Sequence, residues 1–70
     1  MSEVIASMAG SVWKIVVSEG ENVSSGQEVI ILESMKMEIP LAAGTSGKIK
    51  QIHISEGDFV NEGDVLAIIE

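Results

Sequence analysis

An internal repeat constrains the fold of this chain more than any other feature of its sequence. When the chain is displaced by 37 positions, residues 4–33 lie over residues 41–70, and ten of these thirty positions are identical. The clearest match places SEGENVSSG, residues 18–26, over SEGDFVNEG, residues 55–63. Two successive copies of one short unit fill nearly the whole sequence, so the fold must bring two similar halves together.

Glycines recur at matching places in the two copies and indicate turns. Gly20 and Gly26 of the first copy correspond to Gly57 and Gly63 of the second. Glycine adopts positive φ without the steric cost that other residues meet. These four glycines are therefore predicted to form the structural turns of the fold.

The segments between these turns have the character of β-strands. Four aliphatic or β-branched runs stand out, at residues 12–17, 29–32, 48–54 and 65–69. A helix is the competing assignment for residues 28–37, because Glu, Leu, Met and Lys favour helices. The matching segment in the second copy, DVLAIIE, is β-branched, and no continuous apolar helical face is present. The sequence therefore favours strands.

Two copies with short strands and tight turns predict an all-β domain over residues 1–70. We expect two small antiparallel sheets, closed against one another as a sandwich or flattened barrel with pseudo-twofold symmetry. The connector between the copies is residues 34–40, and its symmetry mate is the place where the two chain termini meet. Lys36, inside this connector, is therefore expected at the end of the domain opposite the termini.

The composition indicates how such a small domain is stabilised. The chain has no cysteine, which excludes disulfides and thiolate metal sites. A chain of this length buries only about 60% of the surface that its unfolded form exposes. Hydrophobic residues make up 46% of the sequence, but only Trp13 and Phe59 are aromatic. Stability is therefore expected from a tight aliphatic core and from backbone pairing.

The charge and hydropathy restrict the classes of partner. The formal net charge is −7 and all four basic residues are lysines, whereas binding to phosphates needs the opposite balance. The longest apolar run, residues 65–69, is too short to span a bilayer. The first ten residues lack the basic and apolar regions of a signal peptide. We expect a cytoplasmic chain that binds neither nucleic acid nor membranes.

The remaining polar and aromatic residues are interpreted as structural. His53 is expected to face outward from a strand. Trp13 is expected to pack, and the alternative is an indole half exposed on a strand that serves a partner surface. The acids of the turns are interpreted as solvated rather than as metal ligands; these are Glu19, Glu21, Glu56, Asp58, Glu62 and Asp64. In particular, Asp58, Asn61 and Asp64 lack the spacing of a calcium loop.

A resemblance to a known family is carried by ESMKMEIP, residues 33–40, and by both of its flanks. With GSVWKIVVSEGENVSSGQEV before it and GKIKQIHISEGDFVNEGDVL after it, this segment resembles the biotinyl/lipoyl attachment domain family. The resemblance is greatest to biotin carboxyl carrier domains and free-standing biotin/lipoyl attachment proteins, and it covers nearly the whole chain. It implies a barrel-sandwich hybrid, a flattened barrel of two four-stranded sheets.

The resemblance also implies a modification site. Lys36 falls on the family lysine that projects from a hairpin turn and is acylated by biotin, and Met35 and Met37 fall on its flanking methionines. The neighbouring Glu33, Ser34 and Glu38 complete the segment that would present the cofactor. Lipoyl domains usually carry Asp-Lys-Ala at this turn, so the methionines favour biotin over lipoate.

By the same resemblance, the chain is a carrier and not an enzyme. A biotin protein ligase would attach biotin to Lys36, and the biotin would carry carboxyl groups between a biotin carboxylase and a carboxyltransferase. The chain alone is expected to be a monomer, without catalytic residues or a metal. Two alternatives stay open: a lipoyl carrier for acyl or aminomethyl transfer, and an unmodified interaction module of the same fold.

The turn that would carry Lys36 is unusual in its sequence. Residues 34–37 read SMKM, without the glycine, asparagine or aspartate that tight hairpins prefer. A two-residue hairpin centred on Met35 and Lys36 would need positive φ at non-glycine residues, at a cost of about 1–3 kcal/mol. We expect the strain to hold the lysine outward on a rigid tip, between two methionines whose flexible side chains suit contact with a partner.

Overall fold

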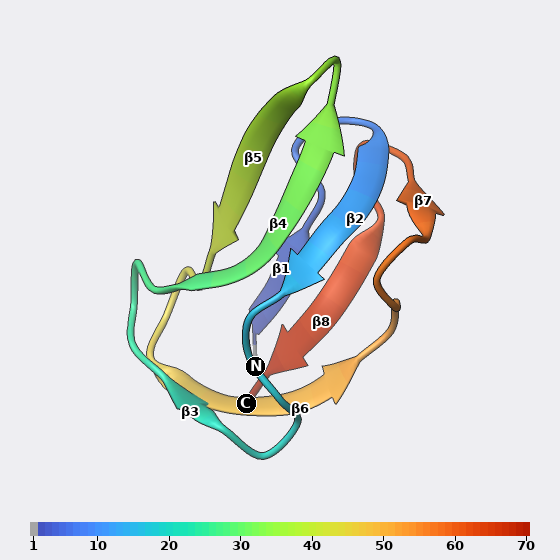
Figure 1. Ribbon diagram of the computed structural model, residues 1–70. Helices are drawn as coiled ribbons and strands as arrows, with labels where there is room; N and C mark the ends of the chain where they lie inside the picture. Colours follow the sequence, from blue (N-terminus) through green and yellow to red (C-terminus); the bar gives the residue numbers. More distant parts are fainter. Residues whose placement is uncertain (1) are drawn as a thin grey trace.

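The computed structural model describes residues 2–70, which form eight β-strands in two four-stranded antiparallel sheets. In chain order the strands are β1 (Ser2–Ile5), β2 (Gly10–Ile15), β3 (Asn22–Val23), β4 (Glu28–Ser34), β5 (Met37–Ala42), β6 (Gly47–Ile52), β7 (Phe59–Val60) and β8 (Val65–Ile69). The sheets have the orders β1-β8-β6-β3 and β5-β4-β2-β7, and they lie against one another as a flattened barrel (Figure 1). The all-β prediction is confirmed, and segment 28–37 contains a strand and a turn rather than a helix.

The sequence repeat reappears as symmetry between the two sheets. The strands β1, β8, β6 and β3 of one sheet correspond in order to β5, β4, β2 and β7 of the other. Each sheet combines strands from both copies, because β8 and β6 come from the second copy and β1 and β3 from the first. The predicted pseudo-twofold arrangement is confirmed, and the two copies are interleaved rather than packed as separate units.

The four glycines that were expected at turns all have positive φ, between 88° and 95°. The Gly20 N–H donates a hydrogen bond of 2.7 Å to the Ile49 carbonyl, and the Gly57 N–H donates one of 2.8 Å to the Val12 carbonyl. In both cases the turn of one copy binds a strand of the other. The turns therefore hold the two copies together as well as reversing the chain.

The acidic residues of these turns are exposed, as expected, but most of them also bind the backbone. Glu19 Oε2 accepts a hydrogen bond of 2.8 Å from the Ile52 N–H, and Glu56 Oε2 accepts one of 3.0 Å from the Ile15 N–H. Three more acids, Glu21, Asp58 and Asp64, accept from N–H groups within their own turns. The interpretation of these residues as merely solvated was therefore incomplete. Among residues 2–70, no group of three or more acidic or histidine side chains could hold a metal ion.

The core between the sheets is aliphatic, as the composition predicts. Ile30, Leu32 and Leu66 are completely buried, and the buried residues of the described chain include no polar or charged side chain. Trp13 remains 43% exposed, with the Lys14 Nζ 5.1 Å from its ring centroid. His53 is exposed and follows the end of β6. Trp13 and His53 thus both lie outside the core.

The β4–β5 hairpin and the chain termini mark opposite ends of the molecule. The molecule measures 31 × 19 × 19 Å, and the tip of the hairpin lies at one end of the long direction (Figure 1). At the other end Ser2 pairs with Ile69, so the first and last strands lie side by side. This placement of residues 35 and 36 agrees with the symmetry argument. Within residues 2–70 there is also no helix long and apolar enough to cross a membrane.

Candidate functional site

The tip of the β4–β5 hairpin has the conformation that its sequence was expected to require. Ser34 and Met37 form the last pair of the ladder, so Met35 and Lys36 alone make the turn. Their φ angles are +52° and +64°, and they are the only non-glycine residues with positive φ in the part of the chain that is described. Positive φ at both central residues is the mark of a type I′ hairpin, a geometry that asparagine and glycine normally supply. The backbone of this tip is therefore strained.

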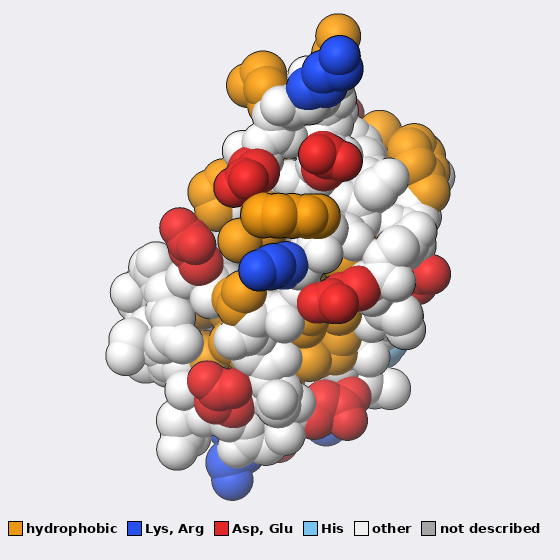
Figure 2. All heavy atoms as spheres, viewed as in Figure 1, with side chains coloured by type: hydrophobic (Ala, Val, Ile, Leu, Met, Phe, Trp, Pro, Cys, Tyr) orange, Lys and Arg blue, Asp and Glu red, His pale blue; other side chains and the backbone are white. Residues whose placement is uncertain are grey.

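The side chains of the tip are directed into solvent. Met35 is 89% exposed and Met37 64%, and Lys36 is exposed between them. Figure 2 shows a lysine and apolar side chains projecting together beyond the body of the molecule. Exposed methionines cost hydration free energy without adding to the core. Neither methionine therefore contributes to the packing of the core.

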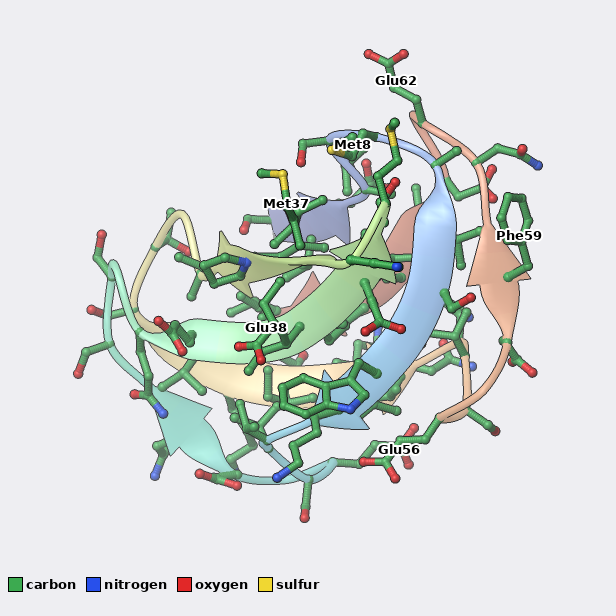
Figure 3. The ribbon with its side chains drawn as sticks, turned by 45° about the horizontal axis from the view of Figure 1, so that its top comes forward. Met8, Met37, Glu38, Glu56, Phe59 and Glu62 are labelled. Atoms are coloured by element: carbon green, nitrogen blue, oxygen red, sulfur yellow. The ribbon has the colours of Figure 1, made fainter. Side chains whose placement is uncertain are left out.

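The base of the hairpin carries the other three residues that the sequence singled out. Ser34 is half buried, whereas Glu33 and Glu38 are exposed. Glu33 and Glu38 are paired directly across β4 and β5, so their side chains share one face of the sheet. Met37, the next residue after the turn, lies on the other face (Figure 3). All six residues from 33 to 38 are thus brought together at one end of the barrel.

A groove that the sequence did not predict lies beside the lysine. Its volume is about 430 Å³, and it is lined by Ala9, Gly10, Ser11, Glu33, Ser34, Met35, Lys36 and Phe59. Phe59, on the short strand β7, is 67% exposed (Figure 3). The signal that could have found it is its place in the repeat, where it corresponds to Asn22 and so departs from the pattern of the other copy.

Gly10 supports the hairpin from behind and was also missed. A Cβ atom at this residue would lie 2.7 Å from the Glu33 carbonyl oxygen and 3.3 Å from the Ser34 Cβ. Its counterpart Gly47 has the same relation to the other sheet, where a Cβ would lie 2.5 Å from the Glu70 carbonyl oxygen. The identity of the two glycines in the repeat was the available signal. Gly10 lets β2 approach the end of β4 closely enough to fix the base of the tip.

The chemical group that distinguishes this site is the exposed primary amine of Lys36. The groove lining offers carboxylate, hydroxyl and apolar groups beside the lysine, but neither an imidazole nor a thiol. A lysine amine is largely protonated at neutral pH and needs activation before it reacts as a nucleophile. The arrangement therefore exposes the Lys36 amine without an imidazole or a thiol in the groove beside it.

Comparisons with known proteins point to one family. The model of the family described as Biotin-requiring enzyme matches residues 1–69. The biotin/lipoyl attachment protein of Bacillus subtilis (strain 168) is 59% identical over 59 residues, which are 84% of this chain and 81% of that protein. The biotinylated protein TB7.3 homolog of Mycobacterium leprae (strain TN) is 43% identical over 67 residues, 96% of this chain and 94% of that one.

A solved structure agrees with these sequence relatives. The crystal structure of the Kluyveromyces lactis urea carboxylase superposes with a TM-score of 0.93 at 38% sequence identity. The match covers 99% of this chain and 6% of the carboxylase. The whole of the present fold is thus similar to one small part of a much larger carboxylase.

Proposed function

Because the chain belongs to the biotin/lipoyl attachment family and is a biotin carrier domain, we propose that Lys36 is the residue that carries the biotin. The observation that carries this proposal is the hairpin tip, where Lys36 stands exposed on a strained two-residue turn at the end of the molecule. Lys14, Lys48 and Lys50 lie in strands instead.

The residues around Lys36 fit an attached biotin. The acyl acceptor must be an exposed primary amine, and the tip offers one between two exposed methionines. The position opposite the paired strands β1 and β8 leaves Lys36 clear of anything joined to the chain termini. Closed sheets beneath the hairpin can sustain the strain of its turn.

We infer that a biotin protein ligase performs the attachment. The ligase would present the biotin carboxyl group as an acyl-adenylate. The deprotonated Lys36 Nζ would form an amide bond with the carboxyl carbon, and the carbon–oxygen bond to the leaving AMP would break. The nitrogen would release one proton to the solvent. The amide removes the charge of the lysine and lengthens its side chain. The exposed Met35 and Met37 give the ligase adaptable apolar contacts.

After attachment, this chain would hold and present the biotin while partner enzymes act on it. Biotin supplies the group-carrying chemistry. Tethering keeps it at an effective concentration of roughly millimolar near the active sites of a docked partner. The similarity to the urea carboxylase supports a biotin carboxylase and a carboxyltransferase as the partners.

Intact mass spectrometry tests the attachment. The chain is incubated with biotin ligase, ATP and biotin, and the protein isolated from its own cells is measured alongside. We expect a gain of one biotinyl group in both samples. A lipoyl group on the cellular protein would instead support the second function of the family, which the name of the Bacillus subtilis relative includes. No gain in either sample would overturn the proposal.

A further inference from the structure

The groove beside Lys36 breaks the symmetry between the two copies. Phe59 corresponds to Asn22 in the repeat, and Ser11 corresponds to Lys48. The two sheets are built from equivalent strands, so a residue that the frame itself requires should recur at the equivalent place. The apolar Phe59 and the uncharged Ser11 occur only at the Lys36 end. Because the fold does not require Phe59 and Ser11 at these positions, we expect their role to lie at the Lys36 end alone.

Phe59 is poorly explained by the packing of the fold. Its side chain is 67% exposed, and the buried core does not include it. Ser11 pairs with Phe59 on one side and with Glu33 on the other. Paired residues place their side chains on the same face of a sheet. The phenyl ring, a hydroxyl and a carboxylate thus form one row that leads toward the base of the hairpin.

We propose that this groove is a resting site for the biotinyl group on Lys36, with Phe59 as its apolar wall and Glu33 and Ser11 as its hydrogen-bond acceptors; the proposal rests on the proposed attachment of biotin to Lys36. Lys36 itself lines the groove, so the arm begins at the rim of its own binding site. The groove volume of about 430 Å³ lies within the range of small-molecule sites, roughly 300–1,000 Å³.

The chemistry of the attached group matches this row of side chains. The biotin head group is uncharged, with an apolar thioether ring on one side and a ureido group with two N–H donors on the other. The thioether ring can pack on Phe59, and the ureido N–H groups can donate to the Glu33 carboxylate and the Ser11 hydroxyl. Acylation also removes the lysine charge, so no ammonium group competes with the ureido group for the two acceptors.

Weak binding is sufficient because the ligand is tethered. At an effective concentration of roughly millimolar, an intrinsic dissociation constant in the millimolar range gives about half occupancy. The groove is open to solvent. The resting arm therefore exchanges freely with an extended arm that partners can take up.

Nuclear magnetic resonance of the biotinylated full chain tests the proposal. The reference is the same chain acetylated on Lys36, which has lost the lysine charge but has no head group. We expect nuclear Overhauser contacts between the biotin ring protons and the Phe59 ring. We also expect amide shifts at Ser11, Glu33 and Phe59 that the acetylated chain lacks.

Phe59→Asn is the matched variant, because Asn22 already occupies the equivalent position in the other copy. This variant should lose the biotin-dependent shifts at Ser11 and Glu33, and its biotin should associate with streptavidin about twice as fast. Trp13→Ala, which changes the other exposed aromatic residue, should retain both the shifts and the parent rate.

The two proposals fail in different ways. Intact mass is measured first, and a chain that accepts no biotin overturns the attachment and the resting site together. A chain that carries biotin but gives the same spectra as the acetylated chain, with no contact to Phe59, overturns the resting site alone. A streptavidin association rate unaffected by Phe59→Asn would also count against it.

Discussion

Glu33 and Glu38 face one another directly across β4 and β5, immediately below the turn that carries Lys36. Both side chains are exposed, and because the two residues are directly paired they lie on the same face of the sheet. Like charges directly opposite one another destabilise an antiparallel pair. The like-charge pair and the positive φ angles of Met35 and Lys36 both destabilise this end of the hairpin. A hairpin without these two features would be more stable.

Relief of this repulsion should stabilise the chain. We expect Glu38→Gln to raise the free energy of unfolding by roughly 0.2–1 kcal/mol at low salt, as measured by urea denaturation. The gain should shrink at 1 M salt, where the Debye length is about 3 Å. Glu62→Gln, an equal reduction of the net charge at an exposed turn, is the control. An equal gain in both variants would show that the Glu33–Glu38 pair has no specific effect.

The turn glycines offer a test of the frame. Gly57→Val should lower the free energy of unfolding by at least about 1–2 kcal/mol, because the φ of 95° is unfavourable for a residue with a branched Cβ. No heavy atom lies within 4 Å of a Cβ built at this position, so the penalty comes from the backbone and not from a clash. Gly57→Asn, which tolerates a left-handed backbone, should cost less. A thermal melt that is the same for Val and Asn would contradict this explanation.

The bonds between the two copies should contribute measurably to stability. Glu56→Ala removes the acceptor of the Ile15 N–H, and Glu19→Ala removes the acceptor of the Ile52 N–H. Each change should cost about 1 kcal/mol in the free energy of unfolding, as determined by denaturant titration. Glu62→Ala is the control. If Glu56→Ala and Glu19→Ala are as stable as Glu62→Ala, the prediction is wrong. The two N–H groups would then bind water in the variants at no cost in the free energy of unfolding.

The repeat predicted much of the fold because the symmetry acts on backbone geometry. Matching glycines indicated turns with positive φ, and the connector between the copies indicated where Lys36 would lie. The strand assignment was less accurate at its ends. The run at residues 12–17 was expected to be extended throughout, but β2 ends at Ile15, and the buried Val17 follows as the chain leaves the sheet. Hydrophobicity alone does not distinguish a strand residue from a buried connector.

The features that the sequence did not predict depend on which segments meet in space. Glu56 binds the backbone of Ile15, which lies 41 residues away, and no local pattern shows that the partner belongs to the other copy. The groove joins Phe59 to the Lys36 hairpin through the pairing of β7 with β2 and of β2 with β4. Sequence analysis singled out Lys36 and its neighbours in the hairpin from their motif. It missed the part of the groove formed by β2 and β7, because these strands are distant from the motif in the sequence.

The methionines at the tip should separate recognition from stability. We expect Met35→Ala and Met37→Ala each to change the free energy of unfolding by less than about 0.5 kcal/mol, as is usual at exposed positions. The buried Leu32→Ala should cost about 2–5 kcal/mol. Both methionine variants should nevertheless accept biotin more slowly from the ligase, as measured by a time course of intact mass. A parent-like rate in both would show that the ligase does not contact them.

The central claim is that Lys36 alone carries the biotin. The most direct measurement compares the parent chain, Lys36→Arg and Lys48→Arg after incubation with biotin ligase, ATP and biotin, using intact mass and peptide mapping. We predict one biotinyl group on the parent and on Lys48→Arg, located on Lys36, and none on Lys36→Arg, because a guanidinium is not a comparable acyl acceptor. Biotin on Lys14, Lys48 or Lys50, or a biotinylated Lys36→Arg variant, would contradict the account.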